Sequence, residues 1–89
     1  MPQMPRVPTP QHRLALDSHI GSRIRSRRVE IGQSQTALGE AICTSFQQVQ
    51  KYERGINRVS ASTLYDVAEA QGVEVGYYYE GYARPAEQP

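Results

Sequence analysis

The positions of proline constrain this chain more than any other feature. All six prolines lie near its ends, at positions 2, 5, 8, 10, 85 and 89. Because proline removes a backbone donor and breaks helices, only the stretch from Gln11 to Arg84 can hold uninterrupted helices. We expect a folded domain over residues 17–81. Residues 1–16 and 82–89 lack apolar periodicity and are predicted to be disordered tails.

Within this window the apolar residues recur at helical spacing, and capping residues divide the pattern into five short helices. We expect the first helix to begin at Asp17 or Ser18 and to end at Gly32. The next three begin at Ser34, Ser45 and Ser60, and Gly55 and Gly72 end the third and fourth. Val75 to Glu80 is expected to form a last short turn. The inward positions are Ile20, Ile24, Ile31, Leu38, Ala41, Ile42, Val49, Tyr52, Leu64, Val67 and Ala68.

The second and third helices are separated only by residues 43–45. Such a short link favours the steep crossing of a helix-turn-helix over an antiparallel hairpin. Close packing at this crossing needs small residues, and Ala37, Gly39 and Ala41 supply them. At the third helix, Ser45 and Gln48 fit a capping box, in which each side chain bonds the other residue's backbone amide. The predicted fold class is therefore all-α, with a helix-turn-helix at its centre.

Charge is unevenly distributed, although the formal net charge is only +1. Residues 23–58 carry seven basic side chains against three acidic ones, whereas residues 59–89 carry one against five. A positive region of this kind suits nucleic acid, although ordinary surface charge is the alternative interpretation.

Several function classes find no support. One cysteine, Cys43, allows no internal disulfide, and the two histidines lie far from it in sequence, so no metal or other cofactor is expected. There is no paired nucleophile and base, carboxylate cluster or phosphate loop, so an enzyme is not expected. No stretch resembles a membrane span or a signal peptide, which favours a cytoplasmic location.

The exposed face of the predicted third helix carries Ser45, Phe46, Gln47, Gln48, Gln50 and Lys51. A glutamine amide can donate and accept together, which matches the N6 and N7 groups of adenine in the major groove of DNA. Lysine can address guanine or a phosphate. A solvated polar face is the alternative, but such faces usually mix acids and bases, and this one has no acid before Glu53.

Four segments together resemble the phage-repressor type of helix-turn-helix domain, also called the xenobiotic-response-element (XRE) family of bacterial regulators. They are residues 20–25 (IGSRIR), 32–35 (GQSQ), 38–42 (LGEAI) and 49–55 (VQKYERG). They occur in the family's order and spacing over residues 20–81, about two-thirds of the chain. The resemblance implies a compact five-helix domain whose third helix enters the major groove.

The resemblance also implies roles for individual residues. Arg28 and Glu53 match a structural ion pair between the first and third helices. Cys43 stands at the turn position where the family usually has a left-handed glycine. A redox role for this cysteine is the less favoured alternative. The implied base-reading residues are Ser45, Phe46, Gln47, Gln48 and Lys51, with Gln48 toward the edge of the face. The implied phosphate contacts are Gln35, Thr44, Arg54, Asn57, Arg58 and Ser60.

One recognition helix covers only half a turn of DNA, so we expect a homodimer on a pseudo-palindromic operator. The expected interface residues are Val75, Tyr77, Tyr78 and Tyr79, although some of them can instead close the domain's own core. The predicted function is a transcriptional regulator, with repression favoured. An antitoxin or adaptor that binds a protein partner is the alternative. The N-terminal segment could reach DNA through Arg6 or Arg13, but a disordered tail is the favoured interpretation.

Overall fold

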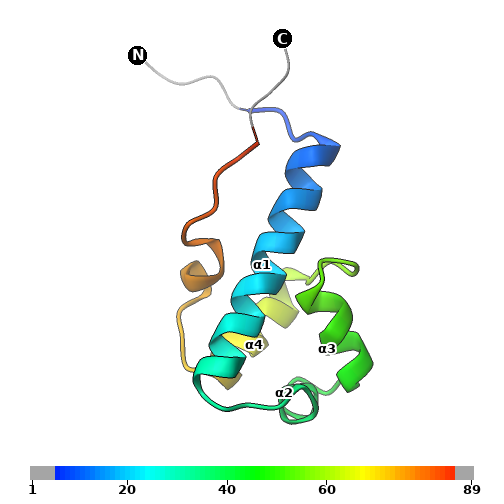
Figure 1. Ribbon diagram of the computed structural model, residues 1–89, viewed down its shortest axis with the longest axis vertical. Coiled ribbons are helices and arrows are strands. Elements are labelled where there is room, and N and C mark those ends of the chain that lie inside the picture. Colours follow the sequence, from blue (N-terminus) through cyan, green and yellow to red (C-terminus); the bar gives the residue numbers. More distant parts are fainter. Residues whose placement is uncertain (1–5, 86–89) are drawn as a thin grey trace.

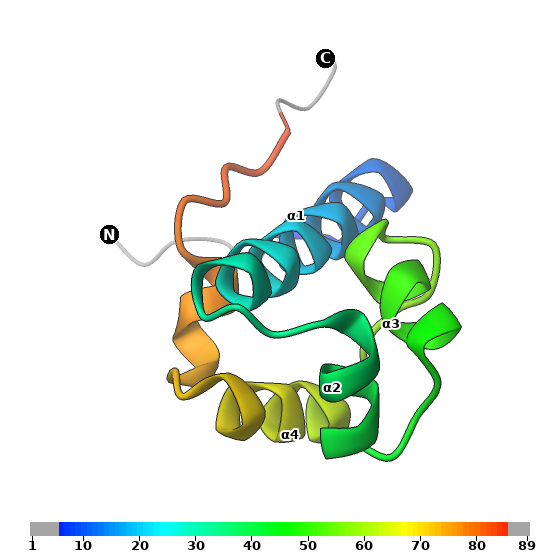
Figure 2. The ribbon, with the colours of Figure 1, turned by 60° about the horizontal axis from the view of Figure 1, so that its bottom comes forward.

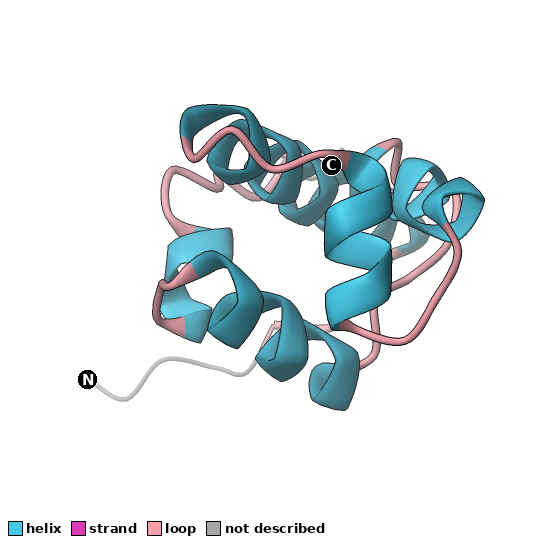
Figure 3. Cartoon of the chain, turned by 90° about the horizontal axis from the view of Figure 1, so that it is seen from below, coloured by secondary structure: helices cyan, strands magenta, loops and turns pink. Residues whose placement is uncertain are grey.

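The computed structural model describes residues 6–85, which form four α-helices and one short 3-10 helix (Figure 1). No strand occurs in this range, as Figure 3 shows. The elements are α1 (Pro10–Glu30), α2 (Gln35–Ala41), α3 (Phe46–Glu53), α4 (Ala61–Gln71) and η1 (Val75–Tyr79). The all-α architecture expected from the sequence is confirmed, with the last of the five helical segments being 3-10.

Helix α1 begins at Pro10, well before the start at Asp17 or Ser18 that the sequence predicted. The Thr9 side chain accepts a hydrogen bond from the backbone N–H of His12 at 3.1 Å and so caps the helix. Proline is tolerated at the first helical position because its missing N–H would have no partner there. Residues 10–16 are therefore helical, where the sequence predicted a disordered tail.

The C-terminal segment packs back against this first part of α1, on the left in Figure 1. The Tyr82 hydroxyl lies 2.7 Å from His12 Nδ1, and the Tyr82 ring contacts both His12 and His19 edge-on or tilted. The backbone carbonyl of Glu80 accepts a hydrogen bond from His19 Nε2 at 2.7 Å. Tyr82 thus belongs to the folded unit, whereas the sequence placed it in a tail. Of the rest of the expected tails, residues 6–9 and 83–85 are described and form no helix, and residues 1–5 and 86–89 lie outside the described residues.

The predicted caps of the middle helices are present. Ser34, Ser45 and Ser60 accept hydrogen bonds from the backbone N–H groups of Ala37, Gln48 and Thr63. Gly72 ends α4 in the left-handed conformation, with φ of 68°. These caps fix where the short helices begin and end, as local side-chain chemistry predicts.

The core is formed by residues from every helical element: Ile20, Ile24, Leu38, Val49, Leu64, Val67, Ala68 and Tyr78. Two predicted core residues are exposed, and two others, Ile42 and Tyr52, are half-buried. Ile31 is 41% exposed because α1 ends before it, so it leaves the buried stripe. Ala41 is the last residue of α2, whose buried face is made by Leu38 and Gly39.

Two glycines allow helices to approach closely. A Cβ atom at Gly21 would lie 2.2 Å from the Tyr52 carbonyl oxygen, so α1 and α3 touch backbone to backbone there. A Cβ at Gly39 would lie 2.7 Å from the Thr44 carbonyl oxygen. Of the three small residues predicted for the α2–α3 crossing, Gly39 meets this need, whereas Ala37 and Ala41 are exposed. Figure 2 shows α2 and α3 crossing beside α1, with α4 below.

Candidate nucleic-acid interface

The turn between α2 and α3 has the geometry of a helix-turn-helix. Cys43 has φ of 61°, and it is the only residue other than glycine with positive φ in the described chain. The next backbone N–H, of Thr44, donates to the Gly39 carbonyl at 2.8 Å and closes the turn. Cys43 therefore adopts the left-handed conformation that the family resemblance implied, with an exposed side chain.

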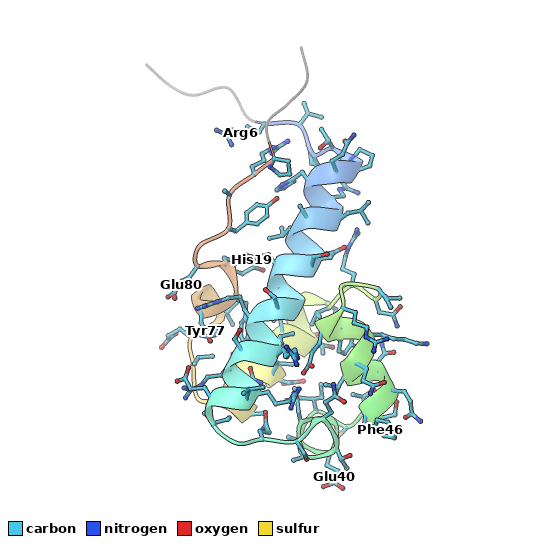
Figure 4. All side chains as sticks on the ribbon, in the orientation of Figure 1. Arg6, His19, Glu40, Phe46, Tyr77 and Glu80 are labelled. Atoms are coloured by element: carbon cyan, nitrogen blue, oxygen red, sulfur yellow. The ribbon has the colours of Figure 1, made fainter. Side chains whose placement is uncertain are left out.

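One side of helix α3 packs against the domain, and its other side is exposed. Val49 is fully buried and Tyr52 is half-buried, so the inward positions are as predicted. Phe46, Gln47 and Lys51 are exposed, and the Phe46 ring projects away from the body of the domain (Figure 4). Phe46 is 43% exposed, so a large part of its apolar ring faces solvent.

Three of the predicted contact residues are already engaged inside the domain. The Ser45 hydroxyl caps α3 by accepting the Gln48 N–H at 3.2 Å. The Gln48 amide oxygen accepts from Asn57 Nδ2 at 2.9 Å. This bond replaces the second half of the predicted capping box, because the Gln48 side chain is drawn toward the α3–α4 loop. The bond thereby ties α3 to that loop.

A largely buried ion pair joins α3 to α1. Arg28 Nε donates to Glu53 Oε2 at 2.7 Å, and Arg28 Nη2 donates to Glu53 Oε1 at 3.2 Å. Gln35 Nε2 donates to the same carboxylate at 3.1 Å, and the Gln35 oxygen accepts from Gln50 Nε2 at 3.1 Å. This series of hydrogen bonds joins α1, α2 and α3 and fixes the orientation of the Gln35 amide. Gln50 therefore has a structural partner and does not simply face solvent.

An open groove lies above this ion pair. It is lined by Arg25, Arg28, Ser34, Gln35, Gln50, Glu53 and Arg54. Three arginines against one glutamate give the groove a positive balance. Gln35 and Arg54 were predicted phosphate contacts, and the fold brings them to this one groove. Arg25 was not predicted, and only its basic charge near other predicted contacts could have indicated it.

The remaining predicted phosphate contacts follow α3 or precede it. Arg58 is exposed, and its Nε donates to both Asp17 carboxylate oxygens, at 3.1 and 3.3 Å. The Ser60 hydroxyl is used as the cap of α4, and Thr44 is half-buried in the turn. Together with Arg54 and Asn57 they lie on the segments that flank α3, although Arg58 already has a carboxylate partner.

The predicted dimer residues separate into two groups. Tyr78 is fully buried in the domain's own core and donates its hydroxyl hydrogen to Gln71 Oε1 at 2.7 Å, so it cannot contact a second subunit. Val75 packs against the same core. Tyr77 is half-buried beneath the Arg23 guanidinium, 3.8 Å from the ring centroid. Tyr79 is 45% exposed and is the member of this set most available to a partner.

Residues 6–85 contain no group of three or more His, Cys, Asp or Glu side chains that could hold a metal ion. No helix within them has the length and apolar character needed to cross a membrane.

The fold and the exposed α3 face define a helix-turn-helix DNA-binding domain of the transcriptional-regulator class, which is not a class of enzymes. The sequence pattern of the helix-turn-helix family HTH_3 matches residues 24–78. The chain belongs to this family, and the resemblance to XRE-type regulators is confirmed.

The chain is similar to an uncharacterized HTH-type transcriptional regulator, y4wC, of Sinorhizobium fredii, with 54% identity over 66 residues. It is 48% identical over 69 residues to an uncharacterized transcriptional regulator in the ATPase CF(0) region of Rhodospirillum rubrum. These matches cover 74% and 78% of this chain but 46% and 64% of the two relatives. The chain thus spans about half to two-thirds of the length of these relatives.

Two solved structures share the fold. The clp gene regulator ClgR of Corynebacterium glutamicum matches with a TM-score of 0.69 and 32% identity, covering 71% of this chain and 67% of that one. The P22 c2 repressor, solved in complex with a synthetic operator, matches with a TM-score of 0.65 and 27% identity, covering 71% and 96%.

Proposed function

We propose that this chain is a transcriptional repressor that binds a pseudo-palindromic DNA operator as a homodimer, with α3 in the major groove. The observation that carries the proposal is the exposed face of α3. Phe46, Gln47 and Lys51 project from a helix whose opposite side is anchored by Val49. A polar and aromatic face held this rigidly is suited to read base edges.

The three exposed residues supply different chemistry. The Gln47 amide matches the N6 and N7 groups of adenine, and Lys51 matches guanine O6 and N7. The Phe46 ring fits the methyl group of thymine, which would cover its exposed apolar surface. Ser45 and Gln48 have one hydrogen-bonding function committed inside the domain, so we assign them supporting roles at the edge of the face.

Backbone contacts are proposed for the residues beside α3: Gln35, Thr44, Arg54, Asn57, Arg58 and Ser60. Such contacts set the register of the protein on DNA without reading sequence. Arg58 would have to exchange its Asp17 partner for a phosphate, or hold both. Asn57 would act through its bond to Gln48, which couples the loop to the recognition helix.

The dimer is proposed because one recognition helix reads too few base pairs for selective binding in a genome. Tyr79 is the proposed contact residue, with Val75 and Tyr77 beside it. The fold neighbour P22 c2 repressor, solved with an operator, supports a repressor role by similarity.

Selection of bound duplexes from a random library, at two salt concentrations, tests this function. We expect a recovered motif with two-fold symmetry whose base preferences persist at the higher salt. Retention of all sequences alike, with a dependence on salt only, would overturn the proposal, because counterion release from phosphates acts without regard to sequence.

A further inference from the structure

The groove between α1 and α3 carries positive charge in addition to the Arg28–Glu53 ion pair. Arg28 is largely buried and its charge is matched by Glu53, with side chains 13% and 3% exposed. Arg25 and Arg54 also line the groove, and both are exposed. Neither guanidinium has a hydrogen-bond or ion-pair partner within residues 6–85. Two unpaired cations therefore face one groove, one from α1 and one from the end of α3.

The floor of the groove offers a donor of fixed orientation. The Gln35 amide donates one hydrogen to Glu53, and its oxygen accepts from Gln50. Its second amide hydrogen has no partner within the described residues. A neutral donor in the same groove as two guanidinium groups is suited to an anion with several acceptor oxygens. Arginine pairs with phosphate through parallel N–H groups.

We propose that this groove seats one phosphate of the DNA backbone and that Arg25 is a DNA contact equal in role to Arg54. The inference rests on the proposed function and extends the interface from the helix-turn-helix onto α1. Arg25 lies on α1 and not on the exposed face of α3, so its contact positions the protein and does not select bases.

The test uses the duplex recovered by the selection and a scrambled duplex of equal composition. Dissociation constants are measured against KCl concentration for the native chain, Arg25→Gln and Arg25→Lys. Arg27→Gln is the control, because it removes the same charge from the opposite side of α1, where Arg27 bonds Gln71 and Glu30. Thermal melting by circular dichroism establishes that each variant is folded at the assay temperature.

We expect Arg25→Gln to reduce the slope of log affinity against log salt by about 1 and to weaken both duplexes about tenfold at low salt. Arg25→Lys should keep the slope, and Arg27→Gln should leave it unchanged. An unchanged slope in Arg25→Gln, or an equal loss in both glutamine variants, would overturn the inference. If no base motif is recovered, the proposed function fails, while the scrambled duplex still tests the groove.

Discussion

Arg28 and Glu53 meet side-on, with two arginine nitrogens donating to the two carboxylate oxygens at 2.7 and 3.2 Å. The pair joins α1 to the C-terminal end of α3, and Gln35 adds a third hydrogen bond from α2. Because both charges are largely removed from water, each depends on the other. The pair therefore holds the C-terminal end of α3 against α1.

Replacing one partner should expose this dependence. We expect Arg28→Met to lower the free energy of unfolding by about 3 kcal/mol, because Glu53 would remain buried without its counter-charge. Urea denaturation followed by circular dichroism measures the change. The double variant Arg28→Met with Glu53→Leu should recover a large part of the loss, and a double variant that loses the sum of two single losses would contradict the account.

The close approach of α1 and α3 at Gly21 gives a second prediction. We expect Gly21→Ala to lower the free energy of unfolding by about 2 kcal/mol or more, because the new methyl would meet the Tyr52 carbonyl at 2.2 Å. Gly76→Ala is the matched control, since no atom lies within 4 Å of a Cβ there. Equal melting temperatures for the two variants would show that the helices do not touch at Gly21.

The left-handed turn at Cys43 predicts a stabilising substitution. A residue with a Cβ is strained at φ of 61°, so Cys43→Gly should raise the free energy of unfolding by up to about 1 kcal/mol. Cys43→Ala keeps the Cβ and removes only the thiol, so its stability should match that of the native chain. If the alanine variant gained as much as the glycine variant, the thiol and not the backbone would be the source of the effect.

The buried hydroxyl of Tyr78 predicts a loss of stability at high pH. Burial, with a smaller effect of Tyr77, raises the pKa of Tyr78 above the ordinary tyrosine value of about 10. The folded state therefore holds this proton more tightly than the unfolded state does. Its contribution to stability is complete below pH ~10 and is lost as the pH rises further.

Denaturation in urea at several pH values tests this dependence. Tyr78→Phe should lower stability near neutral pH by about 1–3 kcal/mol, because Gln71 loses its bonded hydroxyl, and should flatten the decline above pH ~10. Tyr79→Phe, at a 45% exposed ring, is the control. An alkaline decline that is as steep in Tyr78→Phe as in the native chain would place the responsible proton elsewhere.

Helices α2, α3 and α4 could be predicted from the sequence, because the residues that determine their bounds lie within or next to each helix. Serine caps and helical apolar spacing determine where α2, α3 and α4 lie. The start of α1 was missed, although threonine followed by proline is itself a local helix-start signal. The contact that covers this part of the helix comes from Tyr82, far away in sequence, and the local pattern does not show it. Ile31 was misplaced for a related reason, since periodicity does not show that a helix has ended.

The same contrast applies to the interface. The exposure of Phe46, Gln47 and Lys51 could be predicted, because a short amphipathic helix has one exposed face. The groove beside Arg25 depends on the packing of three helices, and the sequence pattern carries no sign of it. Tyr78 was placed in the dimer interface because an aromatic cluster has the same composition whether it closes a core or covers a partner.

The base-reading role of α3 is tested by comparing Gln47→Ala with Arg54→Ala on the selected duplex and on its single-base variants. Gln47→Ala should lose preference at one base pair in each half-site and keep it elsewhere, because one amide contact is removed. Arg54→Ala should weaken every duplex by a similar factor. If both variants weakened all duplexes alike, the exposed face of α3 would not be the part of the protein that reads DNA sequence.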